Sequence, residues 1–329
     1  IEVVKTADLP KLIEILRKVA KEDPSIKVEI NEQTGESLLS GMGELHLEII
    51  EGRIKSEKGL EVKMGQPIVV YRETVTKQSD EEEGRSPNKH NGFFLRIEPL
   101  EDDVYGLIDS GDISEGRIKK KSDELFNKLS KLGWSGDMTR DIRDIYKGNM
   151  FLDETRGEVH IGEVIEMVLD AFEMVIDQGP LAREPCNKMK VALVDIKLHE
   201  DAIHRGPAQV YPAVREAMKG AMKSGGASML EPVQIHLIEV PESFMGEITK
   251  LVGSKRGQLI DMSQDLGVAH IKAKIPVAEM IGWSNDLRSA TEGRGNSSLV
   301  DQLFEKVPSG MQADVIRKIR ERKGLAENQ

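Results

Sequence analysis

Residues 189–226 read MKVALVDIKLHEDAIHRGPAQVYPAVREAMKGAMKSGG and predict a strand, a short turn and a helix. The first ten residues alternate between apolar and polar side chains, as a half-buried strand does. Pro207 has φ preset for a first helical turn, and the glycine pair at 225–226 ends the helix. Gly206 tolerates the left-handed backbone of a sharp reversal. The strand residues expected in the core are Val191, Leu193, Ile196 and Leu198.

The turn places His204 and Arg205 at its apex, between two rigid elements. Such a position can aim a side chain at a partner, so His204 is a candidate contact to RNA. A solvated surface histidine is the plainer alternative. His199, Glu200 and His204 also suggest a zinc protease, but the spacing is HExxxH, which puts the imidazoles about 140° apart around a helix. This spacing disfavours a shared metal.

Composition bounds the class of protein. The chain has 329 residues, enough for two or three domains, and a net charge of -11 with basic residues mixed among the acids. Any nucleic-acid contact must therefore be local. The single cysteine, Cys186, excludes an internal disulfide framework and suggests a reducing compartment. No apolar run approaches a membrane span of about 20 residues, so we expect a soluble, cytoplasmic protein without a membrane partner.

The two ends of the sequence predict similar small domains. Residues 1–76 follow the order strand, helix, two strands, helix, strand, which is a split βαβ (ferredoxin-like) sandwich, and the same order returns over 231–307. The first strand, IEVV, starts without a methionine, so we expect the C-terminal part of a longer protein. The first helix presents one apolar face, the next two strands flank a turn at Thr34 and Gly35, and a second helix covers 45–56. The residues of that apolar face are Leu9, Leu12, Ile13, Leu16 and Val19.

The region between them, 77–230, is a larger mixed α/β domain, which makes the fold class α+β with three domains. Asp80 to Glu83 form an acidic run that we interpret as a solvated loop. Asn91 and Gly92 form a turn signal before a strand, so the residues before them make an exposed basic loop. Helices are expected over 122–132, 161–178 and 312–323. The residues of the basic loop are Arg85, Ser86, Pro87, Asn88, Lys89 and His90.

Catalytic and nucleotide motifs are not found in the sequence. The nearest match to a phosphate loop, GDISEGRI at 111–118, has arginine where the motif needs lysine. No Cys or His cluster has metal spacing, and no nucleophile stands with a base. The chain alone is therefore expected to have no catalytic residues and no cofactor.

Several motifs resemble the translation elongation factor 2 family in its archaeal form. GMGELHLEI at 41–49 is similar to the signature of its third domain, and GWSNDLRSATEGRG at 282–295 to its fifth. RSPNKHN at 85–91 and LHEDAIHRG at 198–206 resemble two loops at the tip of its fourth domain. Pro207 and Ala208 replace the glycines of the eukaryotic pattern, which favours the archaeal branch. IRERKGL at 319–325 resembles its C-terminal helix.

The resemblance implies a role in ribosomal translocation of tRNA and mRNA. Domain III would be 1–76, domain IV 77–230 plus 308–329, and domain V 231–307. His204 would be converted to diphthamide by dedicated enzymes, and the tip would enter the decoding centre, with rRNA of the GTPase-associated region as a further partner. The GTPase domain, with its GTP and magnesium, and domain II would be missing, and the protein would be a monomer. The implied RNA-contacting residues are Arg85, Pro87, Asn88, Lys89, His90, His204 and Arg205.

Rival interpretations differ in testable features. A GTPase of ribosome assembly or splicing would share the domain order, but we would expect it to lose the AIHRG tip that stands at 202–206. Bacterial elongation factor G would lack SPNKHN and AIHRG together. A free-standing RNA-binding module would have no phosphate loop upstream in its coding sequence. An enzyme using His199, Glu200 and His204 would show bound metal or hydrolase activity.

Overall fold

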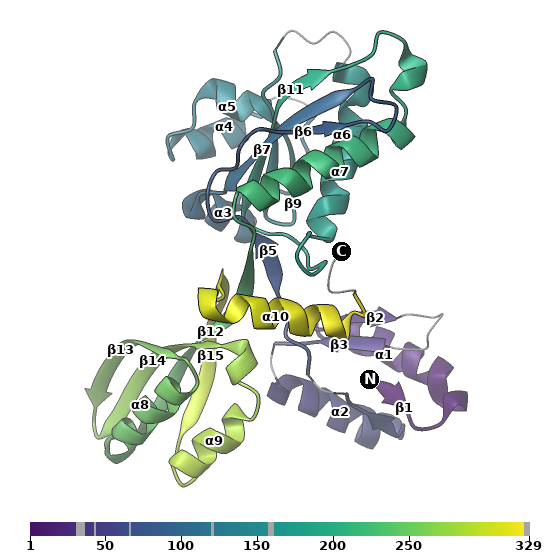
Figure 1. The fold of residues 1–329 in the computed structure, drawn as a ribbon. Helices are drawn as coiled ribbons and strands as arrows, with labels where there is room; N and C mark the ends of the chain where they lie inside the picture. The colour runs from purple at the N-terminus through teal and green to yellow at the C-terminus, as the bar shows by residue number, and fades with distance from the viewer. Residues whose placement is uncertain (31–36, 43, 66, 120–121, 157–160, 326–329) are drawn as a thin grey trace. The chain divides into compact units, whose positions relative to one another are not determined.

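Two groups of residues form the units of the fold in a computed structural model of the chain (Figure 1). One unit comprises 1–70 and 231–304, and the other 71–230 and 305–329. The structure describes residues 1–30, 37–42, 44–65, 67–119, 122–156 and 161–325. The chain is mixed α+β, as predicted. No helix in these ranges is long and apolar enough to cross a membrane.

Residues 1–70 follow the predicted element order, but their strands form two separate ribbons. β1 pairs with β4 and β2 with β3, while the N-terminal ammonium of Ile1 donates to the carbonyl oxygen of Ser37 on β3 at 2.7 Å. Helix α1 buries Leu12, Leu16 and Val19 as predicted, and also Ile15, whereas Ile13 is half-buried. The predicted turn at Thr34 and Gly35 lies outside the described residues. The elements are β1 (Glu2–Val3), α1 (Leu9–Glu22), β2 (Lys27–Ile30), β3 (Ser37–Ser40), α2 (Glu44–Lys58) and β4 (Val62–Lys63).

Residues 231–304 form an antiparallel sheet with two helices. The strand order β13-β14-β12-β15 is the order of a split βαβ unit, and β12 pairs with β14 from Val233 to Pro241. Ile248 and Val252 of α8 and Trp283 of α9 pack on its buried face. The elements are β12 (Ser228–Pro241), α8 (Met245–Ser254), β13 (Gln258–Asp265), β14 (Val268–Pro276), α9 (Trp283–Ala290) and β15 (Asn296–Lys306).

A six-stranded sheet organises the second unit, in the order β6-β7-β11-β10-β9-β8. Only β10 and β11 pair in parallel among the registers described, and α6 forms the crossover between them, as a parallel pair requires. β5 (Arg72–Thr74) pairs with residues 228–230 of the same unit. The sheet consists of β6 (Glu82–Arg85), β7 (Gly92–Pro99), β8 (Gly116–Arg117), β9 (Ile142–Tyr146), β10 (Asn149–Asp153) and β11 (Met189–Lys197).

Helices cover both faces of this sheet. α6 (Ile161–Asp177) and α7 (Pro207–Ser224) pack on one face around Phe93, Phe151 and Phe172. On the other face, α3 (Asp102–Asp109) and α4 (Asp123–Ser130) pack around Leu129, Ile145 and Trp134, beside α5 (Gly136–Asp141). Figure 1 shows α7 lying across the sheet. The predicted helices at 122–132 and 161–178 are confirmed.

The strand and helix at 189–226 form as predicted, with differences in burial, in register and at the start of the helix. Met189 to Leu193 are all buried because both faces of the sheet are covered, so the alternation is lost there. A register shift between Leu193 and Asp195 brings Ile196 into the core, as predicted, whereas Leu198 is half-buried. Gly206 caps α7 in extended backbone, with φ −73°, and is not left-handed as expected.

Strand β6 corrects the interpretation of the acidic run. Glu82 and Glu83 belong to a strand that pairs with β7, and only Asp80 and Glu81 precede it. The strand lies close to α7: a Cβ built on Gly84 would come 1.8 Å from the carbonyl oxygen of Ala213. Glycine is therefore required for this approach.

Helix α10 (Ser309–Arg322) completes the second unit from the far end of the chain, where the sequence predicts a helix over 312–323. Ile319 packs with Ala182, Met229 and Val307 in a small core. Lys323 then reaches Glu184 at 2.8 Å. The unit is thus built from two stretches of chain that are far apart in sequence.

Candidate functional site

Two loops meet at one end of the six-stranded sheet, and we call them together the tip: residues 86–91 and 198–206. The first joins β6 to β7, and the second joins β11 to α7. Gly92 pairs with Lys197, so the strands bring the loops side by side. The two motifs chosen from the sequence therefore form one surface.

The second loop contains a single turn of 3-10 helix, Ala202–His204. Asp201 caps it by accepting a hydrogen bond from the Ile203 amide at 3.1 Å, and the His204 amide donates to the Asp201 carbonyl oxygen at 3.1 Å. Ile203 is 78 % exposed. Apolar burial therefore contributes little to holding this turn, and polar contacts must hold it.

Two asparagines of the first loop bind the backbone of the second. Asn91 is buried; its Nδ2 donates to the carbonyl oxygen of His204 at 2.8 Å, and its Oδ1 accepts from the His199 amide at 3.0 Å. Asn88 donates from Nδ2 to the same His204 oxygen at 3.3 Å. Its backbone N–H donates to Gln209 Oε1 at 2.9 Å. The loops are thus joined by side-chain to backbone hydrogen bonds.

Three imidazole rings pack together on this surface. The ring centroids of His90 and His204 lie 5.0 Å apart, those of His199 and His204 4.5 Å, and those of His90 and His199 4.9 Å. His204 is half-buried and His90 exposed. His199 Nδ1 accepts from the Asp201 amide at 3.0 Å. Across the described ranges, no group of three metal-ligating residues is arranged to hold a metal ion.

Arg205 is the main correction to the predicted site. Its side chain is 4 % exposed and points away from the apex of the turn, where the sequence predicted it to lie. Nη2 pairs with Glu163 Oε2 at 2.5 Å, and Nη1 donates to the carbonyl oxygen of His199 at 3.0 Å. This arginine therefore fastens the loop to α6 and does not present its charge to a partner.

The remaining predicted residues lie at or near the tip surface. Lys89 is exposed and has φ +62°, so the reversal between β6 and β7 is centred on it and not on Asn91 and Gly92. Arg85 is the last residue of β6, and its exposed guanidinium pairs with Glu83 at 3.0 Å. Pro87 is exposed and Asn88 half-buried.

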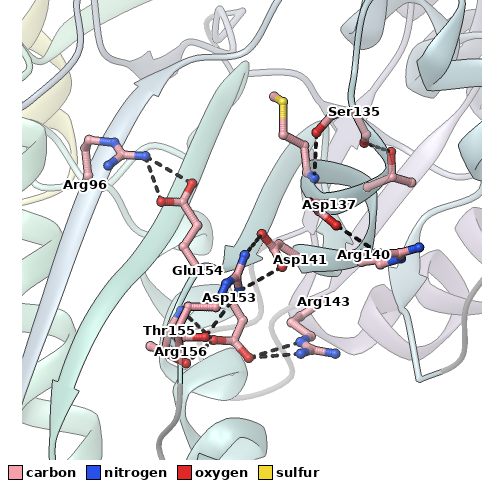
Figure 2. A network of polar contacts seen from close by, with 12 residues as sticks. Arg96, Ser135, Asp137, Arg140, Asp141, Arg143, Asp153, Glu154, Thr155 and Arg156 are labelled. Carbon is pink, nitrogen blue, oxygen red and sulfur yellow. Dashed lines mark hydrogen bonds and ion pairs between the residues drawn. The ribbon is translucent and has the colours of Figure 1, made fainter.

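A second network of polar side chains lies around the carboxyl end of β10 (Figure 2). Arg143 pairs with Asp153 at 3.1 Å, and Arg156 with Asp141 at 2.7 Å. Arg96 donates to both carboxylate oxygens of Glu154, at 3.0 and 2.9 Å. Because β10 and β11 are parallel, this end of β10 faces the same way as the end of β11 that leads into the tip. The network holds residues 153–156, which follow β10.

Asp144 is a buried carboxyl outside the tip. It is 1 % exposed on β9, and no described residue donates a hydrogen bond to its Oδ2. Burial, and next the charge of Glu173, raises the pKa of Asp144 to about 6, while Arg117 opposes the shift. Arg117 pairs with three carboxylates of α6, those of Glu166, Asp170 and Glu173.

Asparagine at position 144 is expected to stabilise the protein above pH 6. The unfolded chain ionises Asp144 near its ordinary pKa of 3.8, whereas the folded chain holds the proton to about 6, so stability falls as pH rises between these values. Asp144→Asn should therefore raise the free energy of unfolding by about 2 kcal/mol at pH 7.5 and leave it almost unchanged at pH 4. Urea titrations at both pH values measure this, and an equal effect at both would contradict it.

Sequence reasoning missed two residues that hold the tip in place. Asn91 was interpreted as part of a turn signal, and Glu163 was only one of many helical acids. Both lie far from His204 in the sequence, by 113 and 41 positions respectively. The motif RSPNKHN contained the asparagines, but nothing in it indicated that their amides bind another loop.

Comparisons with known proteins identify the family. Residues 1–66 match Elongation Factor G, domain III; residues 111–226 match Elongation factor G, domain IV; and residues 228–315 match Elongation factor G C-terminus. Elongation factor 2 of Nanoarchaeum equitans is 50 % identical over 97 % of this chain and 43 % of its own length. That of Methanosphaera stadtmanae is 48 % identical over 99 % and 44 %, and that of Pyrococcus furiosus 48 % over 100 % and 45 %.

These matches show that the chain is part of a translation elongation factor. Its domains follow one another in the order domain III, domain IV and C-terminal domain. The chain spans less than half the length of the curated relatives it matches. It belongs to the archaeal elongation factor 2 family and corresponds to domains III, IV and V of that factor.

Proposed function

We propose that this chain is the part of a GTP-dependent ribosomal translocase whose tip enters the decoding centre and contacts paired mRNA and tRNA. The whole factor would hydrolyse GTP on its GTPase domain, which makes the movement directional. The tip would act as a rigid prop that prevents tRNA from slipping back. The ribosome and its RNAs are then the partners, and the cytoplasm the place of action.

The observation that carries this proposal is the joining of two distant loops into one polar surface. The loops stand on adjacent strands of a sheet that is packed on both faces, so the surface is held firmly. It presents His204, His90 and Lys89. A-form RNA exposes phosphates and 2′-hydroxyls in a shallow minor groove, and a factor that serves every codon should read this shape without reading bases.

We further propose that His204 is the histidine modified to diphthamide, by enzymes that recognise the tip. Its ring is half-buried against two other imidazoles, so part of it is open to a modifying enzyme. The intact mass of the peptide containing His204 tests this. An unmodified mass in protein purified from its natural host would count against it.

The domain limits remain part of the proposal. Domain III would be residues 1–76, domain V 231–307, both ferredoxin-like, and domain IV 77–230 with 308–329. The strand order of residues 231–304 supports the assignment for domain V. The division of the chain after residues 70, 230 and 304 supports a discontinuous domain IV.

Removing the charge of Lys89 is expected to weaken binding to the ribosome and reduce its salt dependence. If Lys89 contacts one phosphate, Lys89→Ala lowers the slope of log affinity against log salt by about 0.7 to 0.9. Lys131→Ala, at an exposed lysine that follows α4, is the matched control and should leave the slope unchanged. Binding to ribosomes across a salt series measures both. Identical slopes for Lys89→Ala and the parent chain would exclude the phosphate contact.

A further inference from the structure

One side chain contacts both ends of the His204 loop. Asn91 Oδ1 accepts from the amide of His199, where the loop begins, and Nδ2 donates to the carbonyl oxygen of His204, where its 3-10 turn ends. Asn91 Nδ2 also lies 3.2 Å from Ser86 Oγ, and the Asn91 side chain is 2 % exposed. One amide group therefore bridges both ends of the segment 199–204, and Asn88 adds only a longer bond of 3.3 Å to the same His204 oxygen.

Only a side chain with a donor and an acceptor can do this. The His199 N–H requires an acceptor and the His204 carbonyl requires a donor, so the orientation of the Asn91 amide is fixed by its partners. Aspartate of the same size keeps the acceptor but puts a second oxygen against the His204 carbonyl. Because Asn91 is buried, water cannot replace the lost bond without cost.

The segment has few other attachments. Ile203 is almost wholly exposed, and the turn has its local cap on Asp201. Arg205 fastens the chain just after the turn. The direction of the His204 ring therefore depends on the peptide groups that Asn91 holds.

We propose that Asn91 is the positioning residue of the tip: its amide sets the loop on which His204 stands and thereby the direction in which the imidazole faces RNA. The effect of Asn91 on the contact with RNA rests on the proposed function. Its effect on the shape of the loop does not. Asn91 itself is buried and touches no RNA. Its loss would leave the sheet beneath intact.

The test compares Asn91→Asp with Asn127→Asp, which makes the same chemical change at an exposed position of α4. Amide hydrogen exchange and histidine-selective NMR of this chain report the loop. In Asn91→Asp the amides of His204 and Arg205 should lose protection roughly tenfold, as for one lost hydrogen bond. The His204 ring signals should shift, whereas those of His236 and His270, outside the second unit, should not. Asn127→Asp should change none of these.

A pH profile separates positioning from loss of structure. A buried carboxyl beside a carbonyl oxygen has a raised pKa, and once protonated it can donate to that oxygen. Protection in Asn91→Asp should therefore recover as pH falls from 7 to 5, while the parent chain shows no such recovery. Should the buried charge unfold the chain, Asn91→Ser brings no charge and is too short to bridge both ends, and the same signals are measured on it.

The outcomes distinguish the two proposals. Unchanged exchange and unchanged His204 signals in the variants would overturn the positioning role. So would ribosome binding that His204→Ala weakens and Asn91→Asp does not. If the loop loosens in Asn91→Asp but neither Asn91→Asp nor His204→Ala alters ribosome binding, the positioning role is supported and the proposed function fails.

Discussion

Alanine at position 84 is expected to destabilise the second unit by about 3 kcal/mol. The added Cβ would lie 1.8 Å from the carbonyl oxygen of Ala213 and 2.8 Å from the amide nitrogen of Ala217, both in the backbone of α7. Backbone atoms of a helix cannot rotate away as a side chain can, so β6 or α7 must move. Urea unfolding followed by circular dichroism measures the loss.

Gly106→Ala is the matched control for this effect. Gly106 lies on α3 of the same unit, and a Cβ there would meet no atom within 4 Å. Because alanine favours a helix, this variant should be neutral or more stable by up to about 1 kcal/mol. Equal stability of the Gly84 and Gly106 variants would refute the close packing of β6 on α7.

Replacing Arg205 with alanine is expected to cost about 2 to 3 kcal/mol and to release the 198–206 loop. The change removes a buried guanidinium that binds Glu163 and the His199 carbonyl oxygen. Breaking a buried ion pair costs about 3 to 5 kcal/mol, and the cost here is smaller because Glu163, half exposed, can be hydrated again. Urea unfolding measures the stability, and limited proteolysis measures cleavage within the loop.

Arg85→Ala removes the same charge from an exposed pair beside the same tip. Its side chain is 65 % exposed, so the free energy of unfolding should be almost unchanged and the loop should resist protease as before. If Arg205→Ala were as stable as Arg85→Ala, the anchoring role would be wrong and Arg205 would again be a candidate phosphate contact.

Most elements of the fold could be predicted from periodicity and turn residues. Pro207 and the glycines at 225–226 gave the limits of α7, and the apolar faces gave α1 and α6. The prediction was wrong at Glu82 and Glu83, because the acidic composition of β6 suits an edge strand as well as it suits a loop. Strand pairing between distant segments, such as that of β1 with β4, leaves no local pattern.

The candidate site was predicted in outline but not in its contacts. Both loops were chosen from the sequence, and the structure brings them together. The burial of Arg205 could not be foreseen, since it depends on Glu163, which the crossover helix α6 places beside the loop. The position of one such residue relative to the other is set by the packing of the helices on the whole sheet.

The return of the chain to form α10 has a consequence for biosynthesis. Residues 231–304 leave the ribosome before α10 does. Their sheet can therefore form while the second unit still lacks α10. Until residues 307–322 have been made, Met229 and Ala182 lack the packing of Val307 and Ile319. Because translation proceeds from the N-terminus to the C-terminus, the unit that bears the tip is completed after the sheet of residues 231–304, although most of its residues are translated earlier.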